Sequence, residues 1–362
     1  MTDVVDVAGA PRVVESRVVG DYLVAATERL GLGSDAATVR AVAASACGAR
    51  LHSVWPDGRR ATTLTLSGFP LEVSVTGGRG EVVPALRYVT ETATEQTEFA
   101  RRAAVQLATI PDLVARLPEA DSTVAELLRS FVATVYPDPA AVSRRHRFVT
   151  WAGITHRAAL PHHAAYLKVY ANLRVVPGAV DRLCRAWPQF AGSVSVPEGW
   201  KFVGPVAAAL EVDSGGDLTH KIYLSTRYND PALPGELVRY LGDPIAEMLA
   251  EFARCGAEAN PVRQYNLALC RAHRHGKSSV TLYLLGKRHT DVTELARALA
   301  ARHHGSTDAV DALAQAAETA GAVWRYSGVG LGFSPDSGID KLNVYGTPLW
   351  ITASAAPARG ER

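Results

Sequence analysis

Lysine and tyrosine recur together in strand-like segments of this 362-residue chain, which contains only six lysines. Three segments carry both residues: AYLKVYANLR (165–174), LTHKIYLSTR (218–227) and DKLNVYG (340–346). A fourth, SSVTLYLL (278–285), keeps the tyrosine and has Thr281 in the position of the lysine. Residues i and i+2 of a strand face the same side, so an ammonium and a phenol lie together on one face. We predict one polar site that is lined by Lys168, Tyr170, Lys221, Tyr223, Tyr283, Lys341 and Tyr345.

The alternative is that these lysines extend outward from a sheet and keep their charged ends in water. The residues on the opposite faces of the same segments are apolar: Leu167, Val169, Ile222 and Leu224. An apolar opposite face packs against a core, which favours the polar site.

A second candidate is Glu72, which lies in the otherwise apolar segment FPLEVSV (69–75). A partly buried carboxylate of this kind can accept a hydrogen bond from a substrate or take its proton, because burial adjusts its pKa. It can equally be a structural carboxylate that pairs with an arginine such as Arg87. We favour the functional interpretation.

Two aromatic or glycine-rich segments allow two interpretations each. Trp151 and Phe148 form either a wall of a substrate pocket or ordinary core, and core is favoured. Tyr326 is predicted to share one strand face with the three glycines of SGVGLGF (327–333), which either leave volume for a bulky ligand or relieve crowding at a bend of the sheet.

Composition limits the classes of protein that this chain can represent. The apolar content of 48% is enough for a core, 20% of the residues are charged, and the net charge is +2. This balance argues against a nucleic-acid coat or a polybasic membrane surface. No long apolar stretch and no signal sequence is evident, and the four cysteines are scattered singly. We therefore expect a cytoplasmic protein that binds neither nucleic acid nor membrane.

Motifs for metals and nucleotides are incomplete in this sequence. Gly276-Lys277-Ser278-Ser279 resembles the end of a P-loop, but a strand follows it, so we predict a hairpin turn. The neighbouring histidines His156, His162 and His163 lack metal-ligand spacing, and there is neither HExxH nor the aspartate-rich DDxxD. We expect no metal and no cofactor.

The tyrosines of the four segments recur at intervals of roughly 50 to 60 residues, which indicates a repeated supersecondary unit. Each unit reads as helix, helix, strand, tight turn and strand, with helices predicted at about 95–115, 120–135, 178–188, 236–256, 291–303 and 307–321. Hairpins of this kind predict an α+β fold, a closed antiparallel barrel of about ten strands with outer helices. A barrel of that size encloses a lumen. We predict one domain over 1–362, with its core at about 15–352 and frayed tails at 1–14 and 353–362.

The repeated lysine–tyrosine strands, the hairpins with outer helices and the segment PLEVSV (70–75) together resemble the aromatic prenyltransferases of the ABBA barrel. Within that family the chain is most similar to the dimethylallyltryptophan synthases, including bacterial indole prenyltransferases, from about residue 60 to 350. The resemblance implies that Glu72 accepts the indole N–H and acts in catalysis. It implies a diphosphate site made of Arg87, Lys168, Tyr170, Lys221, Tyr223, Tyr283 and Tyr345, to which we add Lys341 from the recurring strand pattern. We assign Glu72, Asn172 and Trp151 to the acceptor.

The sequence departs from the family at three points. Thr281 lies where fungal members often have glutamine, and Thr219 lies where they have arginine. The segment before Lys168 offers no lysine that could deprotonate the ring.

The activity implied is transfer of a dimethylallyl or longer prenyl group from its diphosphate to tryptophan or another indole. The reaction would pass through a carbocation-like electrophilic substitution, need no metal and serve secondary metabolism, with the protein a monomer or homodimer. The alternatives are the same barrel acting on a phenol, a phenazine or an aromatic side chain of a peptide, or a non-catalytic barrel that binds a lipid or small ligand.

Overall fold

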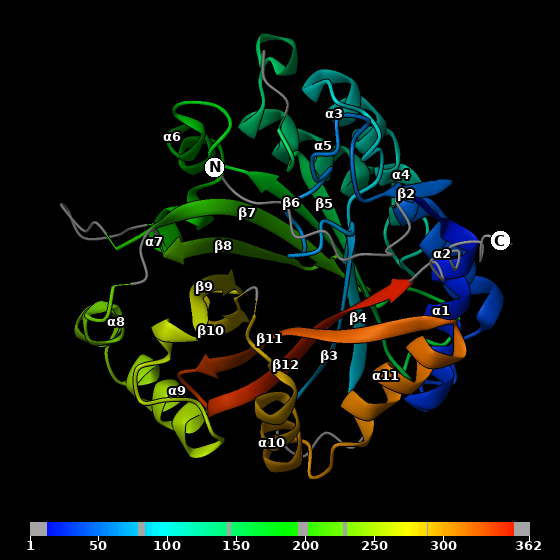
Figure 1. Cartoon of the computed structure of the whole chain (residues 1–362). Helices are drawn as coiled ribbons and strands as arrows, with labels where there is room; N and C mark the ends of the chain where they lie inside the picture. The colour runs from blue at the N-terminus through cyan, green and yellow to red at the C-terminus, as the bar shows by residue number, and fades with distance from the viewer. Residues whose placement is uncertain are drawn as a thin grey trace, which may run out of the picture.

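The computed structural model describes residues 13–78, 84–142, 146–194, 202–226, 230–287 and 289–350. In these residues, ten antiparallel strands close into a barrel, which confirms the predicted fold class (Figure 1). Their order around the barrel is β10-β11-β12-β3-β4-β5-β6-β7-β8-β9. The strands are β3 (Leu71–Gly78), β4 (Ala85–Thr90), β5 (Thr150–His156), β6 (Tyr166–Asn172), β7 (Val203–Asp213), β8 (Leu218–Thr226), β9 (Tyr265–Arg274), β10 (Lys277–Gly286), β11 (Ala322–Ser334) and β12 (Gly338–Trp350).

Helices surround the barrel (Figure 1). They are α1 (Ser16–Arg29), α2 (Ala36–Cys47), α3 (Phe99–Ala108), α4 (Ile110–Val114), α5 (Ser122–Val135), α6 (Ala179–Ala186), α7 (Ala191–Val194), α8 (Leu233–Leu241), α9 (Asp243–Arg254), α10 (Thr293–His303) and α11 (Asp308–Thr319). Three short 3-10 helices cover Pro139–Ala141, Pro188–Phe190 and Pro261–Arg263, and a small pair of strands, β1 (Val13–Glu15) and β2 (Arg50–His52), lies outside the barrel.

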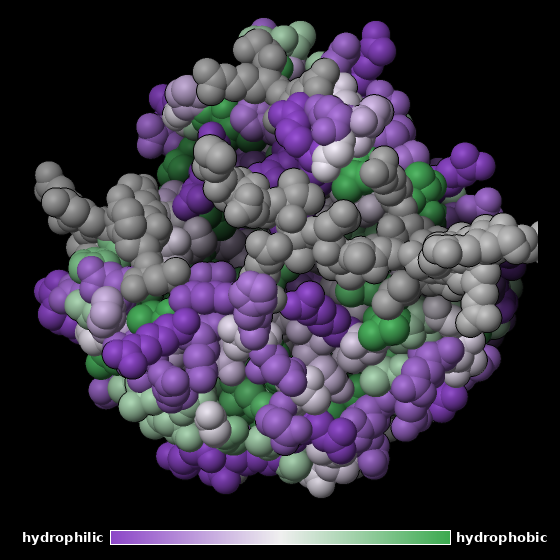
Figure 2. All heavy atoms as spheres, viewed as in Figure 1, coloured by the Kyte–Doolittle hydropathy of each residue, from purple (hydrophilic) through white to green (hydrophobic). Residues whose placement is uncertain are grey.

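The hydrophobic core lies between the outer face of the barrel and the helices. Strand β3 shows the pattern: Leu71, Val73 and Val75 are fully buried on the helix side, while the residues between them face the lumen. Helix α5 contributes Leu128 and Phe131 to the same core. Period-two alternation in the strands therefore separates an apolar exterior from a polar interior. Among the coloured residues on the face seen in Figure 2, hydrophilic ones predominate, with hydrophobic ones scattered between them.

The helix predicted at 236–256 is two helices, α8 and α9, which meet at Gly242. Gly242 has a φ of +73°, a left-handed conformation that a glycine adopts without strain. Pro244 follows in the first turn of α9, where its missing N–H has no helical partner to lose. Helical spacing of the apolar residues continues through this break, which is why the sequence pattern did not reveal it.

A β-bulge in β11 changes which of its residues face the lumen. The register against β12 shifts between Tyr326 and Gly328. The hydroxyl of Tyr326 donates to the carbonyl of Val310 in α11 at 3.1 Å, so this side chain points to the outer helices. The predicted common face of Tyr326 and the glycines is therefore wrong, because the bulge reverses the alternation of the strand.

The predicted tails, 1–14 and 353–362, lie outside the described residues apart from Val13 and Val14, which belong to β1. Within the described ranges, no helix has both the length and the apolar character that a membrane crossing requires.

The glycines of β11 make room for side chains on neighbouring strands. Gly330 lies opposite Tyr283 of β10. A Cβ atom at Gly330 would be 2.6 Å from Cδ1 of the Tyr283 ring, closer than van der Waals contact allows. Of the two interpretations from the sequence, relief of crowding therefore holds at this position, and the relief is for a tyrosine of the candidate site.

We predict that Gly330→Ala destabilises the protein by about 1–3 kcal/mol, because the new methyl group must displace the Tyr283 ring. Gly235→Ala in helix α8 is the matched control, since a Cβ there meets nothing within 4 Å. That control is expected to raise stability by up to about 1 kcal/mol. Chemical denaturation of both variants measures the difference. Equal stability of the two variants would show that Tyr283 does not occupy the space beside Gly330.

Candidate active site

Lys168 and Lys221 face the lumen from strands β6 and β8 and share one carboxylate on the strand between them. The Nζ atom of Lys168 lies 2.6 Å from Oε2 of Glu211, and that of Lys221 lies 2.5 Å from Oε1. Lys168 is only 2% exposed. The alternative in which these lysines extend outward into water is therefore wrong.

Glu211 is a residue of the site that the sequence analysis missed. It lies directly opposite Lys168 in the register of β6 and β7. Burial would raise its pKa, but the ammonium groups of Lys168 and Lys221 hold the pKa well below its usual range, so the carboxylate is ionised. The available signal was its position as an acid directly after the apolar run VGPVAAAL in the strand VGPVAAALEVD (203–213).

Lys341 adds a third ammonium to this group from strand β12. Burial lowers its pKa to about 7, and the positive charges of Lys221 and Arg87 act in the same direction. The carboxylate of Glu211 opposes that shift. These mutual effects show that the cations from four different strands share one electrostatic environment.

Arg87 of β4 completes the cationic group. Its Nε donates to Ser74 at 3.3 Å, and its terminal nitrogen donates to the hydroxyl of Tyr345. The guanidinium also lies over the Tyr345 ring, 5.3 Å from the ring centroid. Glu72 is not among its hydrogen-bonding or ion-pair partners in the described part of the chain, so the structural pairing of Glu72 with Arg87 is not observed.

The four predicted tyrosines line the same lumen in two contacting pairs. The ring centroids of Tyr170 and Tyr223 are 5.3 Å apart, and those of Tyr283 and Tyr345 are 5.9 Å apart. The ammonium of Lys168 lies 5.5 Å from the centroid of the Tyr170 ring. The structure thus brings together all the residues predicted for diphosphate binding, as cations beside aromatic faces that attract positive charge.

Glu72 lies on β3 toward the opposite end of the lumen from Lys341. Lys341 pairs with Gly78, six residues away along β3, which corresponds to about 20 Å of extended strand. Burial raises the pKa of Glu72 to about 7, while the hydroxyl of Ser327, which donates to Oε1 at 2.9 Å, and the charge of Arg87 lower it. Ser327 occupies the bulge of β11, so the bulge supplies the partner of this carboxylate.

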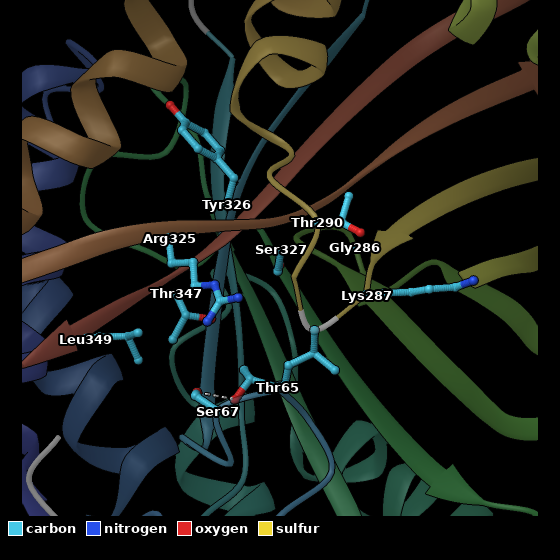
Figure 3. Close-up of a pocket in the computed structure, with 11 residues that line it drawn as sticks. Thr65, Ser67, Gly286, Lys287, Thr290, Arg325, Tyr326, Ser327, Thr347 and Leu349 are labelled. Carbon is cyan, nitrogen blue, oxygen red and sulfur yellow. Dashed lines mark hydrogen bonds between the residues drawn. The ribbon is translucent and has the colours of Figure 1, made fainter. Parts of the chain in front are cut away.

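Ser327, the hydrogen-bond partner of Glu72, lines a pocket (Figure 3). The guanidinium of Arg325 points into it beside Thr347, whereas Tyr326 points away toward the helices (Figure 3). The lining residues are Thr65, Leu66, Ser67, Gly286, Lys287, Thr290, Arg325, Tyr326, Ser327, Thr347 and Leu349.

Trp151 and Asn172, the other two residues assigned to an acceptor, are held by structural hydrogen bonds. The indole N–H of Trp151 donates to Glu91 at 2.9 Å, and its ring stacks on Phe148 with centroids 3.7 Å apart. Its other ring neighbour is Tyr170, at 5.9 Å, so Trp151 borders the tyrosines. The carboxamide of Asn172 donates to the carbonyl of Phe148 and accepts from a backbone N–H two residues later in the chain.

Glu91, which accepts the hydrogen bond from Trp151, is itself held by a buried ion pair with Arg102. Its Oε1 lies 2.8 Å from a terminal nitrogen of Arg102, and both side chains are almost fully buried. Thr62 and the backbone of Val149 also donate to it. This network orients the Trp151 ring against the lumen wall.

Several solved structures share the fold of this chain. No family model matches the chain, and no curated protein matches it by sequence. The 5-dimethylallyltryptophan synthase of Streptomyces coelicolor, in complex with DMASPP and Trp, superposes with a TM-score of 0.69 at 16% identity, over 96% of this chain and 98% of that one. The chain has the fold of the dimethylallyltryptophan synthases. This result confirms the resemblance that the sequence predicted.

Two further structures support the same conclusion about the fold. The 6-dimethylallyltryptophan synthase of Micromonospora olivasterospora, also with DMASPP and Trp, gives a TM-score of 0.68 at 16% identity over 92% of this chain and 97% of that one. AnaPT from Neosartorya fischeri gives 0.62 at 14% identity over 94% and 96%.

We predict that the stability of Glu72→Gln depends on pH differently from that of the parent protein. In the folded protein the pKa of Glu72 is about 7, above its usual value of 4.5. The folded state therefore binds the proton more tightly than the unfolded state, and parent stability falls as pH rises from about 4.5 to about 7. The variant lacks this loss. It should be more stable by about 1–3 kcal/mol at pH 8 and nearly equal at pH 4. Denaturant unfolding at both pH values measures this, and a gap that does not change with pH would contradict a buried, proton-binding Glu72.

Proposed function

We propose that this protein is an aromatic prenyltransferase that moves a dimethylallyl or longer prenyl group from its diphosphate to tryptophan or another indole. The observation that carries the proposal is the cluster of Arg87, Lys168, Lys221 and Lys341 beside tyrosine rings inside one lumen. Two of the structural neighbours were solved with DMASPP and Trp, which supports the same chemistry.

The cationic end of the lumen suits the departure of diphosphate. When the C–O bond of an allylic diphosphate breaks, negative charge develops on the leaving group, and fixed ammonium and guanidinium groups stabilise it as it forms. The three lysines and Arg87 come from four strands of a closed barrel, so they are already in place. Side chains alone supply this charge, and we propose that turnover needs no metal.

The tyrosines suit the allylic cation that remains. Their ring faces attract positive charge by about 0.5–2 kcal/mol per contact and keep water from the cation. An electron-rich ring then attacks, a new carbon bond forms, and the ring loses a proton. The ammonium of Lys168 lies 5.5 Å from the centroid of the Tyr170 ring, which supports the proposal that both functions meet at one point of the lumen.

Glu72 suits the orientation of an indole at the other end. An ionised carboxylate accepts the indole N–H, which draws electron density into the ring and fixes the atom that faces the cation. If nitrogen itself attacks, Glu72 takes its proton, and a pKa of about 7 suits such a base near neutral pH.

A turnover assay with dimethylallyl diphosphate and tryptophan tests the proposal directly. Mass spectrometry should detect a product heavier by one dimethylallyl group, both with magnesium and with excess chelator. A panel of phenols, phenazines and tryptophan-containing peptides identifies another aromatic acceptor if tryptophan fails. No transfer to any acceptor would favour a binding protein instead of an enzyme.

We predict that Lys168→Ala and Lys221→Ala each lower kcat/KM for the prenyl diphosphate by about 30- to 1000-fold. Each change removes a charge-assisted contact of about 2–4 kcal/mol at the transition state. Lys277→Ala is the matched control, because Lys277 lies in the same barrel but is 78% exposed and pairs with Asp336. Steady-state kinetics with varied donor measures the effect. Parent-like values for both lumen variants would place these lysines outside the site.

We predict that Glu72→Gln lowers turnover of an N–H indole at least about tenfold, because a charge-assisted hydrogen bond of about 1.5–3 kcal/mol is lost. A 1-methylindole has no N–H to donate, so parent and variant should differ much less with that acceptor. Equal losses with both acceptors would mean that Glu72 supports the barrel wall and does not contact the acceptor.

A further inference from the structure

Glu211 occupies both lysines that the proposed function assigns to the donor. One oxygen contacts Lys168 and the other contacts Lys221, at 2.6 and 2.5 Å. Thr219 lies directly across from Glu211 on β8. Because threonine is uncharged, it does not compete with the two lysines for the carboxylate. A carboxylate in this place lies where an anionic ligand of the lysines has to bind.

We propose that Glu211 is an internal counter-ion that the diphosphate displaces from Lys168 and Lys221, and that this competition limits how tightly the lumen retains diphosphate. The inference rests on the proposed function, because it takes the donor's diphosphate as the ligand of these lysines. It assigns to Glu211 a role in affinity and release, without contact to the reacting carbon atoms.

Before diphosphate binds, Glu211 is the shared anionic partner of the two lysines. Lys168 and Lys221 are close to each other and poorly hydrated, and burial lowers the pKa of Lys221 while Glu211 raises it. An unpaired buried ammonium is unfavourable and tends to lose its proton. Glu211 contacts both ammonium groups and holds them on either side of one carboxylate.

Binding then exchanges one anion for another. A diphosphate carries more negative charge than a carboxylate and can reach Lys341 and Arg87 as well, so it is the stronger ligand of the whole group. Lys168 and Lys221 have an anionic partner before the exchange, Glu211, and another after it, the diphosphate. The cost of displacing Glu211 subtracts from the binding of donor and of product diphosphate alike.

The competition between Glu211 and diphosphate also affects the release of the product diphosphate. Interactions that bind substrate and product equally well do not accelerate the chemical step, and tight retention of a leaving group makes its release slow. Four positive side chains without a counter-ion would hold diphosphate strongly. Glu211 weakens that hold while leaving every lysine in position for catalysis.

Isothermal titration calorimetry with sodium pyrophosphate tests this, using the full-length protein and two variants. Glu211→Gln keeps the shape of the side chain and removes its charge, and we expect it to bind pyrophosphate at least about tenfold more tightly. The inhibition constant of pyrophosphate against the prenyl donor should fall by a similar factor, and kcat should fall while KM for the donor also falls. Glu98→Gln is the matched control, because Glu98 pairs with Arg101 on the exposed surface. It should bind as the parent does.

Glu211→Asp provides a second test if Glu211→Gln fails to fold. Its shorter side chain reaches one lysine less well, so pyrophosphate affinity should rise by a smaller factor. Unchanged or weaker pyrophosphate binding in the folded variants would overturn the counter-ion role and indicate that Glu211 only positions the lysines. Prenyl transfer by the parent protein is measured separately. Tighter binding in Glu211→Gln without any transfer by the parent would defeat the proposed function and leave the counter-ion role standing.

Discussion

The burial of several positive charges inside one barrel is the constraint on which the rest of this structure depends. Four cationic side chains cannot remain ionised in a poorly hydrated interior unless something compensates them. Glu211 pairs with two of them, the phenol rings face them, and the hydroxyls of Ser74 and Tyr345 bind Arg87. A ten-stranded barrel provides a lumen wide enough for these groups, and Gly330 of β11 leaves space for the Tyr283 ring.

The same constraint divides the lumen into two regions. Lysines from β6, β8 and β12 gather around Glu211, whereas Arg87 of β4 lies opposite Ser74, two residues from Glu72, whose hydroxyl partner is Ser327. Because the pKa of Glu72 is raised to about 7, the protein keeps a carboxylate that is unfavourable for stability near neutral pH. Such a residue is more easily explained by a task in catalysis than by support of the fold. The buried ion pair of Glu91 and Arg102, by contrast, has a structural role, since it holds Trp151 against the wall of the barrel.

Period-two alternation allowed the sequence to predict the lumen-facing lysines and tyrosines, because i and i+2 side chains share a face in any regular strand. It failed where the strand is irregular: the bulge of β11 turns Tyr326 outward and brings Ser327 to Glu72. It also failed for Glu211, because an acid in an apolar strand gives no indication of its partners until the neighbouring strands are in register. The helix break at Gly242 was not predicted for a similar reason, since the helical spacing of apolar residues continues through the break. Local periodicity thus predicts which side of a strand each side chain faces. The side chains that it contacts can be predicted only when the pairing of neighbouring strands is known.

The most direct test of the account is a crystal structure with dimethylallyl thiolodiphosphate, an unreactive form of the proposed donor. The account predicts that diphosphate oxygens lie within about 3.2 Å of the ammonium groups of Lys168 and Lys221, with Glu211 displaced from at least one of them. The prenyl chain should lie against Tyr170 and Tyr223, with its reactive carbon toward the end that holds Glu72. A ligand bound elsewhere, with both lysines still on Glu211, would contradict the account.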